Sequence, residues 1–191
     1  MSKTFLALFA GVLFGLIIHL SIILLLPLFP STNAWKIFAK IAPIGEVIIL
    51  ERPLPGEANI LRLDPELAYA VCRYDLSNGP GLLSGQLTSD FWSVGVFDKN
   101  GVTIFSTTGS SSINNHLQVG IFNPAQTRLL AEQQLGMQEG LIIVEAPRNQ
   151  VFVVVRYAPP YPQMWERYSK VLSKLNCSYL SDSSAPLEIN E

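Results

Sequence analysis

Hydrophobic and polar positions divide the chain into two unlike parts. Residues 5–29 form a largely apolar run of 25 positions without one charged side chain, whereas the later apolar stretches are short and separated by turn residues. At about 1.5 Å per residue, a helix over this run is roughly 37 Å long, against a bilayer core of about 30 Å. The pattern predicts a transmembrane anchor at residues 1–30, followed by one globular domain.

A cleaved signal peptide is the alternative for this run, because Lys3 precedes it and residues 32–34 resemble a small-x-small cleavage site. The apolar part of a signal peptide is about 7 to 15 residues long, and this longer run favours a retained anchor. Lys36 and Lys40 beyond the run nearly balance Lys3, but long domains translocate largely regardless of such charges. We expect a single-pass membrane protein whose carboxyl-terminal domain lies outside the cytoplasm.

One face of the predicted anchor is lined by small residues. Ala7, Gly11 and Gly15 recur at every fourth position, and His19 continues the spacing. Such a face lets a second helix approach closely, so it predicts a helix partner or a homodimer, with His19 as an interhelical hydrogen-bond donor or acceptor. Glycine is also common in membrane helices that do not pair, and this alternative stays open.

Residues 31–45 follow the anchor and alternate apolar and basic positions at helical spacing. Trp35 lies on the apolar face, whereas Lys36 and Lys40 lie on another. Because tryptophan favours the headgroup region and lysine favours anionic lipid, the segment predicts an interfacial juxtamembrane helix in contact with membrane lipid.

Residues 46–177 show short apolar runs of the kind that form strands. We expect strands at residues 46–50, 69–75, 81–87, 91–98, 102–106, 117–122, 141–146 and 151–157. Asn100-Gly101 predicts a two-residue type I′ hairpin that sets Phe97 opposite Ile104 and Val96 opposite Phe105. Residues 147–150 predict a second hairpin, whose two apolar strands would lie at the centre of the domain.

Two helical patterns interrupt the strands. Asn123-Pro124 is a cap and first turn for residues 125–134, and a second apolar face recurs from Met164 to Leu175. The predicted fold is mainly β: a small two-sheet sandwich or jelly-roll-like barrel with one or two covering helices, preceded by a single transmembrane helix. Residues 178–191 are expected to be a polar tail.

Charge and cysteine content narrow the function classes. The part after residue 30 holds 12 basic and 15 acidic residues with its arginines scattered singly, so we expect no nucleic-acid partner. Cys72 and Cys177 are too few for a cysteine-only zinc site. They are expected either to form a disulfide, as an envelope compartment permits, or to remain two buried thiols.

The domain has few candidate catalytic or metal-binding residues. His116 is the domain's single histidine and follows a loop rich in hydroxyls, but no Gly-x-Ser-x-Gly elbow is present. Histidine-rich metal sites are excluded by count, and no acidic spacing matches a calcium loop. We therefore expect no metal, no cofactor and no assigned catalytic residue.

Three motifs carry a resemblance to a known family: residues 74–80 (Tyr-Asp-Leu-Ser-Asn-Gly-Pro), residues 91–93 (Phe-Trp-Ser) and residues 97–101 (Phe-Asp-Lys-Asn-Gly). They resemble the bacterial family of domain of unknown function twelve-fifty-four. The anchor, Ala34-Trp35 and residues 63–71 are similar to its short, membrane-anchored alphaproteobacterial members. Longer members are secreted and carry a second, jelly-roll-like half. The resemblance implies a β-rich fold and supplies no activity.

The sequence thus favours an uncharacterised envelope protein whose periplasmic domain binds a partner protein or an envelope ligand. An envelope hydrolase that uses His116 and a small accessory subunit of a membrane complex are the alternatives. A binding module agrees better with the sparse chemistry than an enzyme does.

Overall fold

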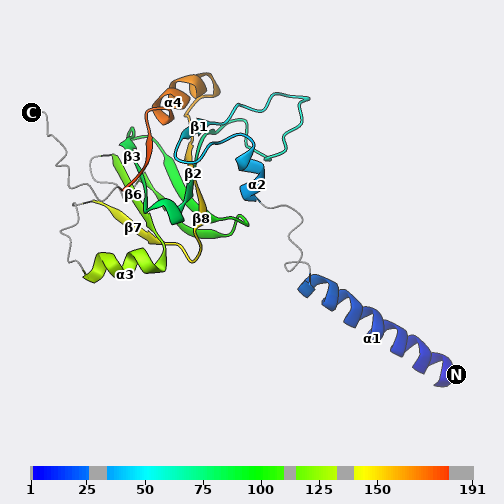
Figure 1. Ribbon diagram of the computed structural model, residues 1–191. Coiled ribbons are helices and arrows are strands. Elements are labelled where there is room, and N and C mark those ends of the chain that lie inside the picture. Colours follow the sequence, from blue (N-terminus) through cyan, green and yellow to red (C-terminus); the bar gives the residue numbers. More distant parts are fainter. Residues whose placement is uncertain (1, 26–33, 110–114, 133–139, 181–191) are drawn as a thin grey trace, which may run out of the picture. The chain divides into compact units, whose positions relative to one another are not determined.

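The computed structural model describes residues 2–25, 34–109, 115–132 and 140–180, which fall into two compact units divided after Asn33 (Figure 1). The first unit is helix α1, Ser2–Leu25. Its Lys3–Leu25 segment is long and apolar enough to cross a membrane, and its side chains are exposed within the unit. Residues 26–29 of the predicted span lie outside the described residues.

The second unit is built from two sheets. The five-stranded sheet has the order β1 (Val47–Ile49), β2 (Ala68–Asp75), β8 (Gln150–Tyr157), β4 (Trp92–Asp98) and β5 (Thr103–Thr108). The four-stranded sheet has the order β7 (Ile142–Glu145), β6 (His116–Phe122), β3 (Gly81–Gln86) and β9 (Asn176–Tyr179). The mainly β two-sheet fold behind a leading helix is confirmed.

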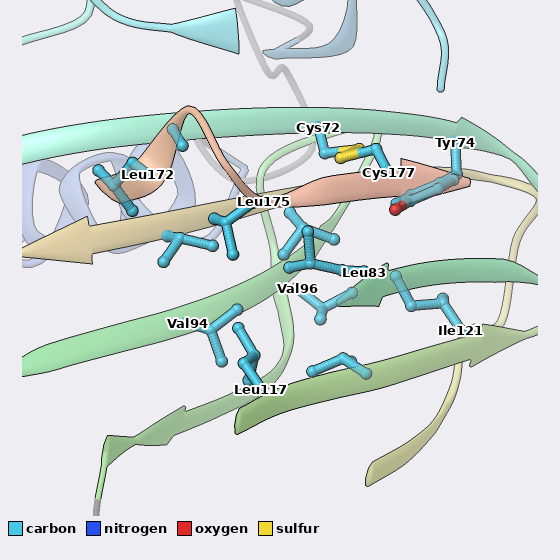
Figure 2. Close-up of a cluster of buried hydrophobic side chains, with 14 of the residues drawn as sticks. Cys72, Tyr74, Leu83, Val94, Val96, Leu117, Ile121, Leu172, Leu175 and Cys177 are labelled. Carbon is cyan, nitrogen blue, oxygen red and sulfur yellow. A yellow bond between two sulfur atoms is a disulfide. The ribbon is translucent and has the colours of Figure 1, made fainter. Parts of the chain in front are cut away.

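The main core lies between the two sheets (Figure 2). Side chains alternate between the faces of a strand, so one set along β2 points into this core, as Cys72 and Tyr74 do. The intervening residues Tyr69 and Val71 belong to a second cluster on the other face. The five-stranded sheet is therefore buried on both faces, which explains why β2 is apolar almost throughout.

Two helices of eight or nine residues flank the strands, and only the second of them along the chain has buried residues. Helix α3 (Pro124–Glu132) links β6 to β7, the one parallel pair among the described strands. It begins with a capping box, in which Asn123 Oδ1 accepts from the Gln126 N–H at 2.9 Å and Gln126 Oε1 accepts from the Asn123 N–H at 2.8 Å. Helix α4 (Trp165–Leu172) buries Tyr168 and Leu172. Three shorter helices are also described in this unit: α2 (Ala34–Ala39), η2 (Leu76–Asn78) and η4 (Pro162–Met164).

The first predicted hairpin forms, but its turn differs from the prediction. Val96 pairs with Phe105 as expected, whereas Phe97 pairs with Thr103 rather than Ile104 because a bulge follows Val96. Gly101 has a positive φ of 86° and Asn100 does not, which excludes the type I′ turn. The carboxylate of Asp98 explains the wider turn, because its Oδ1 accepts from the backbone N–H groups of Asn100 and Val102 at 2.8 and 2.9 Å.

The second predicted hairpin is wrong. Strand β8 lies at the centre of the five-stranded sheet, but β7 is an edge strand of the other sheet and runs parallel to β6. Residues 146–149 therefore cross between the two sheets. Continuous apolar character does not specify a pairing partner, since a buried strand in either sheet shows it. Strand β9, which pairs with β3, was not predicted.

The segment predicted to be an interfacial helix packs into the second unit instead. Helix α2 is only six residues long, and Trp35 and Phe38 are buried against the outer face of the five-stranded sheet. The Trp35 ring lies 4.0 Å from the Arg73 guanidinium carbon, and the Phe38 and Phe152 ring centroids are 4.8 Å apart. The indole of Trp35 is thus unavailable to lipid headgroups, while Lys36 and Lys40 are exposed.

Buried Tyr74 sets an upper pH limit for full stability of the domain. Tyr74 is fully buried and its hydroxyl donates to the Leu82 carbonyl at 2.8 Å; burial, followed by nearby Tyr179, raises its pKa well above the ordinary value of 10.0. The folded state therefore keeps this proton after the unfolded state has lost it. Stability from Tyr74 is complete below about pH 10 and falls by about 1.4 kcal/mol per pH unit above it.

We expect alkaline unfolding in which tyrosinate absorbance and loss of β circular dichroism rise together above about pH 10. Tyr74→Phe removes the titrating hydroxyl and should flatten the decline in stability, while Tyr161→Phe, at an exposed position, is the matched control. If every tyrosine of the folded domain ionises at the ordinary tyrosine pKa of 10.0, this prediction is wrong.

Candidate interaction sites

No contact with another helix tests the predicted helix-pairing face in the described residues. Ala7, Gly11, Gly15 and His19 are exposed on α1, and nothing lies within 4 Å of a Cβ built at either glycine. Ala7 and Gly11 line a shallow groove on the helix together with neighbouring residues. The face therefore has room for a second helix, and pairing stays a prediction.

His116 does not enter a catalytic arrangement among the described residues. It is the first residue of β6, is exposed, and pairs through its backbone with Gln86 of β3. Residues 110–114, which carry most of the loop hydroxyls in the predicted hydrolase site, lie outside the described residues. The structure describes no hydroxyl or carboxylate bonded to its imidazole, and no group of three metal-ligating side chains occurs in the same ranges.

Cys72 and Cys177 are joined by a disulfide, with their Cα atoms 6.4 Å apart. Cys72 lies on β2 of one sheet and Cys177 on β9 of the other, so the bond links the two layers through the main core (Figure 2). Both residues are nearly buried. The bond therefore has a structural role inside the sandwich.

One carboxylate is held by two hydroxyls where α4 meets the sheets. Asp90 Oδ2 accepts from Tyr168 at 2.8 Å and from Thr88 Oγ1 at 2.9 Å, and these two bonds lower the pKa of Asp90. The Tyr157 hydroxyl completes the group by accepting from the Thr88 N–H at 2.6 Å, and burial raises the pKa of Tyr157. Each polar group has an internal partner, so this cluster fastens α4 to the sandwich.

The sequence did not indicate an open polar hollow of about 330 Å³ at one end of the sandwich. Its lining residues come from three connections: β2 to β3, β4 to β5, and β7 to β8. They are Asp75, Ser77, Lys99, Arg148, Asn149 and Gln150. Residues so far apart in sequence meet only because the strand order places these turns together, although Asp75, Ser77 and Lys99 fall within the motifs at residues 74–80 and 97–101.

Two carboxylates lie in or near the hollow, and both accept hydrogen bonds from donors of the domain itself. Asp75 Oδ1 accepts from the Ser77 N–H at 3.1 Å and from the Ser77 hydroxyl. Asp98, behind the rim, uses Oδ1 for two backbone N–H groups of its turn, and its Oδ2 lies 3.8 Å from Arg148. These acidic groups are therefore largely satisfied within the domain.

The other distinctive surface is the β5 edge of the five-stranded sheet, as the described strands define it. Strand β5 is an edge strand of six residues, Thr-Ile-Phe-Ser-Thr-Thr, without a charged side chain. The other described edge strands, β1, β7 and β9, have only three or four residues. Proteins usually protect long edges with charges, prolines or covering segments, because the open backbone pairs readily with another strand.

One solved structure supports this fold. The crystal structure of the VPA0106 protein from Vibrio parahaemolyticus matches with a TM-score of 0.54 at 14% identity, covering 83% of this chain and 38% of that one. An uncharacterised protein from Burkholderia cenocepacia matches with a TM-score of 0.49 at 12% identity, covering 83% of this chain and 41% of its own. This chain thus spans less than half of either protein. No curated protein matches the chain.

A family model identifies the chain more directly. The model of DUF1254, described as "Protein of unknown function", matches residues 44–178, which include every described strand of the two sheets except the last residue of β9. The match agrees with the resemblance carried by residues 74–80 and 97–101, which contribute Asp75, Ser77 and Lys99 to the polar hollow. The short, membrane-anchored type within that family stays a prediction. The chain belongs to the family DUF1254, domain of unknown function twelve-fifty-four.

Proposed function

We propose that the protein is a binding module of the bacterial cell envelope, anchored in the inner membrane by α1, whose β domain holds an extended segment of a partner protein in the periplasm. The observation that carries the proposal is the edge strand β5. Residues 103–107 of this strand are uncharged and lie at an edge of the described sheet, where a partner strand can add by main-chain hydrogen bonds.

The periplasmic placement is supported by the disulfide between Cys72 and Cys177. Disulfides persist in oxidising compartments such as the periplasm and are rare in the bacterial cytosol. The helix Lys3–Leu25 has the length and composition required of the anchor. Together these features favour an uncleaved anchor with a translocated domain.

The proposal is tested by photo-crosslinking in cells from Thr103, an exposed residue of β5. We expect a specific crosslinked partner, and we expect Ser106→Lys to reduce its yield by about tenfold, since a lysine on an edge disfavours strand addition. Ala131→Lys adds the same charge at an exposed position of α3 and should leave the yield unchanged. An equal yield from Ser106→Lys and the parent chain argues against partner binding at β5.

A role as an accessory subunit gains support from the groove on α1, which Ala7 and Gly11 line. Gly11→Leu fills this groove. If a membrane protein is held through α1, this variant loses the crosslinked partner while Ser106→Lys retains it. The opposite pair of results supports capture at β5, so the two proposals are separated in one experiment.

A further inference from the structure

We propose that the polar hollow between the β2–β3, β4–β5 and β7–β8 connections binds a phosphate ester that carries neighbouring hydroxyl groups. The proposal concerns a different part of the domain from the β5 edge and does not depend on partner binding there. It rests on two cations, a set of neutral polar groups and one carboxylate that line the same open space.

The two cations are the only charged donors of the hollow. Lys99 is half-buried, and its ammonium forms no ion pair with any carboxylate in the described parts of the chain. Arg148 has one such contact, to Asp98, at 3.8 Å, which is longer than a charge-assisted hydrogen bond. Both lining cations thus retain donor capacity, and phosphate oxygens are strong acceptors for them.

The acidic groups do not cancel this capacity. Asp98 is buried behind the rim and accepts two backbone N–H groups through Oδ1. Asp75 lines the hollow, and its Oδ1 is occupied by the backbone N–H and hydroxyl of Ser77. No described hydrogen bond uses its second oxygen, which can accept from an alcohol hydroxyl of the ester beside the phosphate group.

The remaining lining suits the same ligand. Asn149 and Gln150 add side-chain amides, although Asn149 Oδ1 already accepts from Asn123 Nδ2 at 3.2 Å, and the Ser77 hydroxyl, which donates to Asp75, can still accept. The backbone is held in place, because the Leu76 N–H donates to the Asn149 carbonyl at 2.8 Å and the Trp35 N–H donates to the Lys99 carbonyl at 3.1 Å. A polyol phosphate, whose source is either a soluble ester or the glycerol phosphate headgroup of a lipid, matches this mixture of donors and acceptors.

The test is a titration of the full-length protein in detergent micelles, followed by backbone amide chemical shifts. We expect glycerol 1-phosphate to shift the amides of residues 75–77, 99 and 148–150 saturably, with an affinity at least fivefold higher than that of inorganic phosphate. Glycerol alone should shift none of them. Nanodiscs with and without phosphatidylglycerol then separate the sources: shifts that appear only with this lipid identify its headgroup, and their absence identifies a soluble ester.

Lys99→Gln supplies the decisive variant, because the Lys99 side chain makes no described ion pair whose loss would disturb the fold. We expect it to weaken glycerol 1-phosphate binding at least fivefold. Lys174→Gln removes a charge from an exposed position outside the hollow and should have no effect. Equal affinity of Lys99→Gln and the parent chain, or shifts spread evenly over the surface, would overturn the proposal.

Discussion

Replacing both Cys72 and Cys177 by alanine is expected to lower the domain's free energy of unfolding by about 3 to 5 kcal/mol. The disulfide closes a loop between positions 105 residues apart, and so restricts the unfolded chain strongly in the chain-entropy view. It also joins β2 in one sheet to β9 in the other. Strand β9 has only four residues and pairs with β3 alone among the described strands, so it depends on this bond more than the central strands do.

Urea unfolding of the full-length protein in detergent, followed by tryptophan fluorescence, measures this loss. Reductant provides the matched control: it should destabilise the parent protein by a similar amount and leave the double alanine variant unchanged. A parent protein whose urea midpoint does not respond to complete reduction of both cysteines contradicts the stabilising role.

Trp35→Ala should lower the unfolding free energy by about 3 kcal/mol, within the range for truncation of a buried aromatic residue. Trp35 is 8% exposed and packs in the second cluster beside Phe38, on the outer face of the five-stranded sheet. Its ring also covers the guanidinium of Arg73, which is 5% exposed and donates to the Ala42 carbonyl at 2.7 Å. Burial lowers the pKa of Arg73, and removal of the indole takes away a favourable cation–π contact.

The same urea titration decides between two roles for this tryptophan. A residue at lipid headgroup depth would leave domain stability unchanged when truncated, whereas a core residue would not. Lys36→Ala, at the exposed neighbouring position, is the control and should change stability by less than about 0.5 kcal/mol. Equal stability of Trp35→Ala and Lys36→Ala would show that α2 does not support the domain.

Strand positions followed from the sequence because they depend on local patterns. Alternating apolar residues and turn chemistry located eight of the nine described strands, most within one or two residues of their observed ends. The predicted cap at Asn123 likewise acts over one turn of helix, where the structure adds Gln126 as its partner. Strand β9 was missed because Asn176–Tyr179 is short and mixed in polarity, and pairing with β3 stabilises it.

Strand partners did not follow from the sequence, and the candidate sites depend on them. The apolar runs of β7 and β8 are compatible with one hairpin or with two different sheets, and only the packing of both layers separates them. The hollow that includes Lys99 and Arg148 exists because that packing brings three connections together. Its residues have no characteristic spacing along the chain.

The sequence by itself determined the division into an apolar leading helix and a β-rich domain, the approximate strands, and the family. These features follow from hydrophobic period and local motifs, which act between neighbouring residues. The tertiary structure decided that Trp35 packs against Arg73, that Cys72 meets Cys177 across the core, and that β5 is an edge strand among the described strands. Each of these depends on contacts between distant segments, whose energies appear only when both sheets are assembled.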